Sequence, residues 1–336
     1  MAIIDQEDNQ CGLDSMTETR GATRSARLFL TSLVVTAATG CAGNLRTEVT
    51  PPPLPVPFVG IELIGELKDF GRSLGGHATE NFLRHSDCQT ADNRCYFTGK
   101  LQLPEFYNTL RMIREDGERC AARSDEYDVF FYPVEAVASG EETITVSLAD
   151  APTERLLVVV PHEDFHNQRE AQKAPTEVSE AAATLVGFVT ASGFAKEKFG
   201  SESSTSRMLA RDAGLFLRKS LLVNQYYEKV SALYRALRSG ALTPAETLER
   251  KARLFAELQE ACSEIAPDPV SFNKCPAAMN NAGLAFDRTY TRHYPMLHDL
   301  YTLLGNDTGT LVVTLKRLLT NWPASASTAA DLMNGQ

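Results

Sequence analysis

The sequence predicts a mainly helical (α+β) domain with a small β-sheet, and three observations favour this fold class. Apolar residues recur at the spacing of amphipathic helices through most of the chain. Only two short segments, residues 128–132 and 142–148, have the β-branched and aromatic composition typical of strands. The length after a proline-rich segment, about 280 residues, suits one large domain or two intimate subdomains. We place this domain at residues 59–322 and expect residues 323–336 to form a flexible tail.

The N-terminal half of the domain is expected to begin with helices at residues 61–83 and 104–119. The two strand candidates follow, and we expect them to form a small sheet ahead of a helix near residue 161. The apolar run 156–160 is expected to be partly extended or kinked, with Pro161 as the first helical residue. The reason is that a proline inside a helix costs about 3 kcal/mol, whereas the first helical position tolerates it.

The C-terminal half of the domain is expected to be helical. One helix opens at Pro175, and residues 206–239 and 244–264 are expected to form a long helical hairpin. A capping box follows the turn of this hairpin, with Thr243 as the N-cap and Glu246 three residues later. A proline takes the first helical position, where its fixed φ angle is suitable.

The most informative motif is His162-Glu163-Asp164-Phe165-His166, which has the form H-E-x-x-H. Residues i and i+4 of an α-helix lie on one face, so both imidazoles can bind the same metal ion. Glu163 can then act as a general base on a water bound to that ion, as in zinc metalloproteases. The alternative is a chance pattern on a solvated helix, and the apolar run before the motif argues against it.

A third ligand is expected, because a catalytic zinc keeps three protein ligands and one open position. Glu177 and Glu180 lie one turn apart near the start of the helix that opens at Pro175. We assign Glu180 as the ligand, since three alanines follow it and small residues let two helices approach closely around an ion. The alternative is that both glutamates only complement the positive end of the helix dipole.

Two separated motifs resemble the Aminopep family of predicted bacterial aminopeptidases, which belongs to the zincin peptidases. The first is H-E-x-x-H-x-Q, ending at Gln168, followed by S-E-x-x-A-T-x-V at residues 179–186. Family members typically show H-E-x-x-H-Q and then N-E-S-x-A-T-F-V. The second is N-N-A-x-L at residues 280–284, followed by Tyr290 and a proline five residues later. The resemblance covers roughly residues 55–320.

The resemblance implies a zincin-like helical metallopeptidase that acts on a peptide or protein substrate. His162, His166 and Glu180 would bind Zn²⁺, and Glu163 would be the catalytic base. A small sheet would lie next to the helix that carries the histidines.

The downstream motif implies two further roles. Tyr290 would donate a hydrogen bond to the developing oxyanion, and Asn281 would bind substrate or hold the helices in place. The alternative for both residues is an ordinary structural role. The sequence departs from the family pattern at four positions: Pro161, Asp164, Gln168 and Ser179.

The N-terminus predicts export. Three arginines precede the apolar run 28–38, and small residues lead into Cys41. This end resembles the lipobox of bacterial lipoproteins, in which the cysteine is acylated and becomes the mature N-terminus. We therefore expect residues 1–41 to be a signal peptide, with Met16 as an alternative start, and residues 42–58 to be a stiff proline-rich linker. The protein would be lipid-anchored in the bacterial cell envelope, facing the periplasm or the exterior. The alternative is a cytoplasmic protein with a similar first helix.

The cysteines suit an oxidising compartment. Cys88 and Cys95 flank one polar loop, and Cys262 and Cys275 flank another, so short disulfides are expected there. Cys120 is left over, and the pairing therefore stays open.

The net charge and the motifs argue against two classes of function. The formal net charge is −10 and no basic patch occurs, which argues against nucleic-acid binding. No G-x-S-x-G motif of a serine hydrolase is present. We expect a zinc-dependent peptidase of the bacterial envelope. The alternative is a non-catalytic envelope lipoprotein with a metal site for structure or partner binding, and a fourth protein ligand would favour it.

Overall fold

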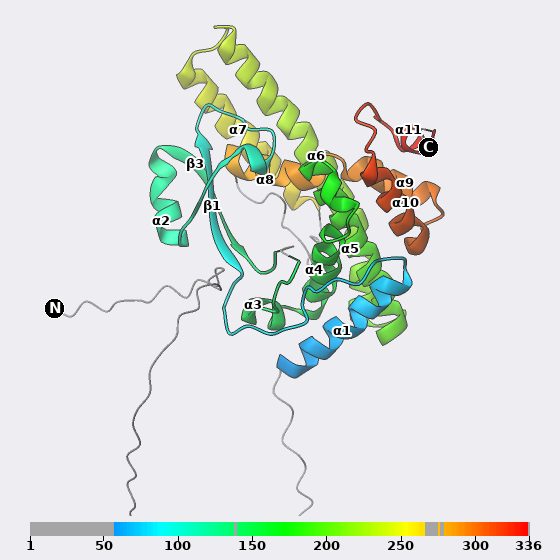
Figure 1. Ribbon diagram of the computed structural model, residues 1–336. Coiled ribbons are helices and arrows are strands. Elements are labelled where there is room, and N and C mark those ends of the chain that lie inside the picture. Colours follow the sequence, from blue (N-terminus) through cyan, green and yellow to red (C-terminus); the bar gives the residue numbers. More distant parts are fainter. Residues whose placement is uncertain (1–56, 138–139, 266–274, 276–278, 335–336) are drawn as a thin grey trace, which may run out of the picture.

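The computed structural model describes residues 57–137, 140–265, 275 and 279–334. Helices form the body of the molecule, and a three-stranded antiparallel sheet covers one side of it (Figure 1), which confirms the mainly helical (α+β) fold class. Cys41, the signal peptide and most of the linker lie outside the described residues. The described helices are α1 (Pro57–Ser73), α2 (Gly117–Ala121), α3 (Val146–Ala149), α4 (Thr153–His166), α5 (Thr176–Phe199), α6 (Ser204–Arg238), α7 (Pro244–Ser263), α8 (Asn281–Thr291), α9 (Tyr294–Leu303), α10 (Thr308–Thr320) and α11 (Ala329–Asn334).

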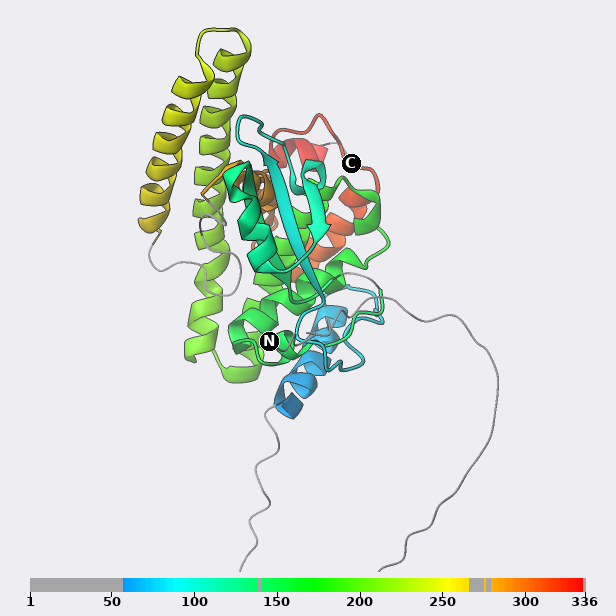
Figure 2. The same cartoon turned by 90° about the vertical axis from the view of Figure 1, so that its left-hand side faces the viewer.

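The sheet has the strand order β2-β1-β3 and consists of β1 (Asp92–Gly99), β2 (Arg111–Arg114) and β3 (Tyr127–Val134). β3 confirms the strand predicted at residues 128–132. Both outer strands pair antiparallel with β1, and Figure 2 shows the sheet in front of the helical body. The sheet contacts α8, and α8 in turn packs on α5 and α6.

The prediction of one helix at residues 104–119 is wrong. This segment forms a 3₁₀ turn (Tyr107–Thr109), strand β2 and the short helix α2. Asp116 ends the extended segment, because its side chain accepts a hydrogen bond from the backbone N–H of Arg119 and so caps α2. The apolar residues whose spacing resembled that of one helix therefore belong to different elements, which lie before and after the N-cap of α2.

The strand predicted at residues 142–148 is also wrong. Only Ile144 makes an isolated bridge, to His85, and the chain then enters α3 with Thr145 as its N-cap. The helix predicted at residues 61–83 is present but begins earlier, at Pro57, and already ends at Ser73. Gly75 follows with a φ angle of 98°, a left-handed conformation that favours glycine and commonly ends helices.

Pro161 lies inside α4, so the extended or kinked segment predicted at residues 156–160 is wrong. Proline lacks the N–H that would bond to the carbonyl of Leu157, at a cost of about 3 kcal/mol. The five apolar residues before it are all at most 5% exposed, and burying each such side chain contributes about 1.5–3 kcal/mol. The free energy gained by burying side chains on every side of α4 therefore exceeds the cost of the missing hydrogen bond.

Helix α5 runs through the centre of the main core and confirms the helix predicted after Pro175. By length and hydropathy it is the one described helix that meets the criteria for a membrane span. However, 89% of its apolar segment is buried inside the protein. Its composition is therefore that of a core helix.

The predicted hairpin is confirmed as α6 and α7, which extend beyond the body (Figure 1), and its capping box forms between Thr243 and Glu246. The tail expected to be flexible instead contains α11, where Leu332 is fully buried and the helix contacts α9. Cys262 pairs with Cys275 as expected. Cys95 pairs with Cys120 rather than Cys88, because β1 brings it over α2.

Candidate metal centre and active-site cavity

The candidate centre lies where α4 and α5 pack together. A close approach of the two helices is possible because α5 carries Gly187 at the crossing. A Cβ atom at this position would lie 2.8 Å from the backbone oxygen of Val158, well inside van der Waals contact. The approach brings the face of α4 that carries both histidines against the first turns of α5.

His162, His166 and Glu180 meet at this crossing, as the spacing of the sequence motifs predicts. The Nε2 atoms of the two histidines are 3.2 Å apart. Oε2 of Glu180 lies 3.3 Å from Nε2 of His162 and 3.1 Å from Nε2 of His166. Tetrahedral ligands with bonds of about 2.0–2.1 Å to a metal ion are about 3.3–3.4 Å apart. The three donor atoms are therefore spaced so that one small metal ion fits them.

Neighbouring hydroxyl groups orient the three candidate ligands. Nδ1 of His166 lies 3.1 Å from Oγ of Ser179, and Nδ1 of His162 lies 3.5 Å from Oγ1 of Thr184. Such contacts fix the ring that faces a metal and are typical of the surroundings of metal-binding histidines. Thr184 also donates to the backbone oxygen of Glu180, at 2.7 Å. One turn of α5 thus supplies both a candidate ligand and the groups that hold the others.

The electrostatics of the centre favour the metal-binding protonation states of Glu180 and His162, whereas the charge of Glu180 outweighs burial and raises the pKa of His166. Burial raises the pKa of Glu180, but the charge of His166 and the hydrogen bonds from both histidines outweigh it and hold that pKa well below its ordinary value. Burial lowers the pKa of His162. A deprotonated carboxylate and a neutral imidazole are the forms that coordinate metal ions.

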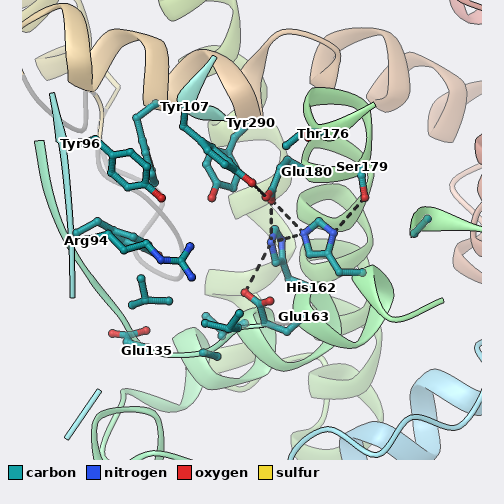
Figure 3. A pocket seen from close by; sticks show the side chains of 18 of the residues that line it. Arg94, Tyr96, Tyr107, Glu135, His162, Glu163, Thr176, Ser179, Glu180 and Tyr290 are labelled. Atoms are coloured by element: carbon teal, nitrogen blue, oxygen red, sulfur yellow. Dashed lines mark hydrogen bonds and ion pairs between the residues drawn. The ribbon is translucent and has the colours of Figure 1, made fainter. Parts of the chain in front are cut away.

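Glu163 lies beside the three candidate ligands without joining them. Its Oε1 atom is 4.0 Å from Nε2 of His162, and its carboxylate lines the same cavity (Figure 3). Burial raises its pKa to about 8. A carboxylate with a raised pKa in a cleft is a candidate general base.

The cavity has a volume of about 380 Å³ and opens to solvent between the helical body and the sheet. Its floor is formed by α4 and α5. Its opposite wall comes from β1, β3 and α8, whose lining residues include Arg94, Tyr96, Tyr132 and Tyr290. A metal centre with a base beside it, at the bottom of an open cavity, can carry out hydrolysis of a bound substrate.

A comparison with known protein families identifies the family of this chain. A family model named Aminopep and described as "Putative aminopeptidase" matches residues 112–329, more than half of the chain. The chain belongs to the Aminopep family. The description of the family supports a peptidase function. No curated protein and no solved structure matches the chain significantly.

In this Aminopep protein, Tyr290 on α8 lies next to the candidate centre. Its ring stacks on that of His162 with 6.3 Å between the ring centroids, and it lines the cavity (Figure 3). Burial raises the pKa of its hydroxyl well above the ordinary value, which keeps the hydroxyl protonated. The position suits the hydrogen-bond donor that the sequence predicts.

Asn281, the other residue of the downstream motif, does not line the cavity. It is fully buried, and its side-chain N–H groups donate to the backbone oxygens of Lys100 and Gln102 and to the hydroxyl of Tyr234. Its backbone N–H donates to Asp128. Asn281 therefore joins α8 to the sheet and to α6, and the substrate-binding role predicted for it has no support from this position.

Two departures from the Aminopep pattern have local partners. The carboxylate of Asp164 accepts a hydrogen bond from Thr79 and lies 3.6 Å from the ammonium group of Lys68. Gln168 makes two hydrogen bonds with the backbone of His77, accepting at 2.8 Å and donating at 3.2 Å. Both residues hold the end of α4 to the loop after α1. Asp164 and Gln168 therefore have structural roles, and neither lines the cavity.

Two residues of the site were missed by the sequence analysis. The hydroxyl of Tyr107 donates to Oε1 of Glu180 at 2.8 Å and so occupies the oxygen that does not face the histidines. Arg94 points into the cavity from β1 (Figure 3). Both lie before residue 112, where the Aminopep match begins. Neither belongs to a local motif, because each reaches the site only through the pairing of strands and helices.

Proposed function

We propose that the protein is a zinc-dependent aminopeptidase of the bacterial cell envelope with a zincin-type centre. One observation carries the proposal. His162, His166 and Glu180 converge on one point at the bottom of an open cavity, and Glu163 lines that cavity beside them. Membership of the Aminopep family supports the peptidase class. Two imidazoles and one carboxylate are a donor set that zinc uses in metallopeptidases.

The residues of the chain divide the work of peptide hydrolysis. Zinc held by the three ligands would polarise the scissile carbonyl and lower the pKa of water at its open position to about 7. Glu163 accepts a proton from the attacking water and delivers it to the leaving amine. The hydroxyl of Tyr290 donates to the oxyanion that develops.

The ligand count favours this proposal over a structural metal site. A structural zinc is normally closed by four protein ligands. Within the parts of the chain that the structure describes, the group of metal-binding side chains at this point contains three residues. The cavity borders all three of them, which leaves room for water and substrate at a fourth position.

We predict that the purified protein removes the N-terminal residue from leucyl peptides and that a chelator such as 1,10-phenanthroline abolishes this activity. Zinc should restore it, since the chelator removes the ion but leaves the ligands in place. Peptides with an acetylated N-terminus are the control, and an aminopeptidase should cleave them far more slowly. Undiminished hydrolysis by protein shown to be free of metal would contradict the proposed mechanism. Equal cleavage of free and acetylated peptides would identify an endopeptidase instead.

The location at the envelope rests on the N-terminal sequence. We predict that cells expressing the full chain incorporate a labelled fatty acid into the protein and that the protein fractionates with membranes. Cys41→Ser should remove the label, because the acylated thiol is lost. A single acyl chain binds membranes only marginally, so stable anchoring needs the several chains of a bacterial lipoprotein. Cys11→Ser is the matched control, and labelling that survives in the Cys41 variant would rule out the lipobox.

A further inference from the structure

Arg94 is the cationic group that β1 presents to the cavity. Successive residues of a strand point to opposite faces of a sheet. Cys95 and Phe97 form a separate core with Cys120 on one face, whereas Arg94 and Tyr96 line the cavity on the other. Figure 3 shows the Arg94 guanidinium group extending across the cavity towards Glu163 and His162.

Arg94 shares its nearest carboxylate with a second arginine. Asp92 accepts a hydrogen bond from Nε of Arg94 at 2.8 Å, but the same carboxylate also accepts from Nε of Arg114 at 3.1 Å. One carboxylate thus serves two guanidinium groups, one of them on the exposed side chain of Arg114. The two arginines hold the pKa of Asp92 below its ordinary value despite partial burial.

The other charged groups of the cavity wall differ from Arg94 in this respect. Nε of Arg155 lies 2.7 Å from Oε2 of Glu135, so these two form a matched pair. Glu180 lies among the candidate metal ligands. Arg94 and Arg155 are the two arginines among the described residues that line the cavity, and Arg94 is the one whose guanidinium group extends towards Glu163 and His162.

We propose that Arg94 binds a carboxylate of the substrate, so that the enzyme prefers peptides with a carboxylate close to the scissile bond. This inference rests on the proposed peptidase function and adds a substrate class to it. A guanidinium group binds a carboxylate through parallel hydrogen bonds and gives both affinity and orientation. In a peptide the carboxylate is either the free C-terminus of a short chain or an acidic side chain. The modest volume of about 380 Å³ suits a short peptide.

Three substrates that differ in the presence and position of a carboxylate test this inference. They are leucylalanine, its neutral C-terminal amide, and the C-terminal amide of leucyl-aspartic acid. The enzyme should favour at least one of the two carboxylate-bearing peptides over the neutral amide by about 10- to 100-fold in kcat/KM, since hydrogen bonds to charged groups are strong. Preference for leucylalanine identifies the C-terminus, and preference for the aspartyl peptide identifies a side chain. Arg94→Met should remove the preference, and Arg94→Lys should retain part of it.

Arg111→Met is the matched control. Arg111 lies on the same sheet, but its side chain stacks on Phe97 and Tyr127 on the face opposite the cavity. Its replacement by methionine removes the same charge from the protein as Arg94→Met does. This variant should keep the preference. A wild-type enzyme that cleaves all three peptides equally would overturn the inference. So would an equal loss for all three peptides in Arg94→Met, because that result would place Arg94 at the reacting centre rather than at a carboxylate.

A binding measurement separates this inference from the proposed function. Calorimetry with the zinc-loaded Glu163→Gln protein should show binding of leucylalanine that weakens about 10- to 100-fold on adding Arg94→Met. If the wild-type protein cleaves no peptide but this binding is observed, the peptidase proposal fails while the carboxylate site stands. If peptides are cleaved and binding does not depend on Arg94, the carboxylate site fails and the peptidase proposal stands. Circular dichroism melting should confirm that each variant is folded.

Discussion

Glu163→Gln should lower peptide hydrolysis by about 10²–10⁴-fold, the range expected when a general base is removed. Glutamine has nearly the same shape, but its amide cannot take a proton from the attacking water. Glu163 lies beside the three candidate metal ligands and is not one of them, so the variant should still bind about one zinc ion per chain. The measurements are kcat/KM for a leucyl peptide and zinc content by mass spectrometry.

Two further substitutions calibrate this prediction. Glu177→Gln makes the same chemical change at a glutamate of α5 that does not line the cavity, and it should leave activity unchanged. Tyr290→Phe should lower turnover by about 10²–10³-fold with little change in melting temperature, because the ring remains and only a donor is lost. Full activity in the Glu163 variant would disprove its role as the base. Full activity in the Tyr290 variant would restrict that residue to packing.

His166→Ala should abolish stable zinc binding and, with it, peptide hydrolysis. Two remaining ligands cannot enclose the ion, and Glu180 would lose the partner whose charge chiefly holds its pKa low. The measurement is zinc retained after dialysis, together with activity at saturating zinc. Ser179→Ala removes only the hydroxyl next to Nδ1 of His166. It should weaken zinc affinity by about 10- to 100-fold, as the loss of such orienting groups typically does.

The fold should survive the loss of the ion. The main core contains α4, α5 and the helices around them, and its buried side chains extend far beyond the ligand positions. Circular dichroism of the His166 variant should therefore retain the helical signal. A variant that keeps one zinc ion per chain and full activity would exclude His166 as a ligand.

The parts that the sequence predicted well are those governed by local rules. The hairpin α6–α7 follows from helical periodicity and from the capping box at Thr243, which act within a few residues of each other. The ligand positions follow from the i, i+4 geometry of α4 and from a glutamate one helix later. No long-range contact has to be known to place His162 above His166.

The parts that the sequence missed depend on tertiary structure. β1 and β2 carry several charged residues, and they form because β1 pairs with partners on both sides. Pro161 suggested a helix start, yet burial of α4 on all sides outweighs its local cost. The partner of Cys95 could not be deduced from spacing, since it is set by the position of α2 over the sheet.

The two halves of the cavity differ in how far apart their residues lie along the chain. His166 and Glu180 are 14 positions apart, whereas Tyr107 and Glu180 are 73 positions apart. Closing the longer loop costs about 1.5 kcal/mol more conformational entropy, because the cost grows with the logarithm of loop length. The candidate metal ligands thus come from segments close together in the sequence, whereas the rest of the cavity wall requires contacts between distant parts of the chain. A sequence can carry every ligand without that wall, so the motif indicates the chemistry but does not determine which peptide is cleaved.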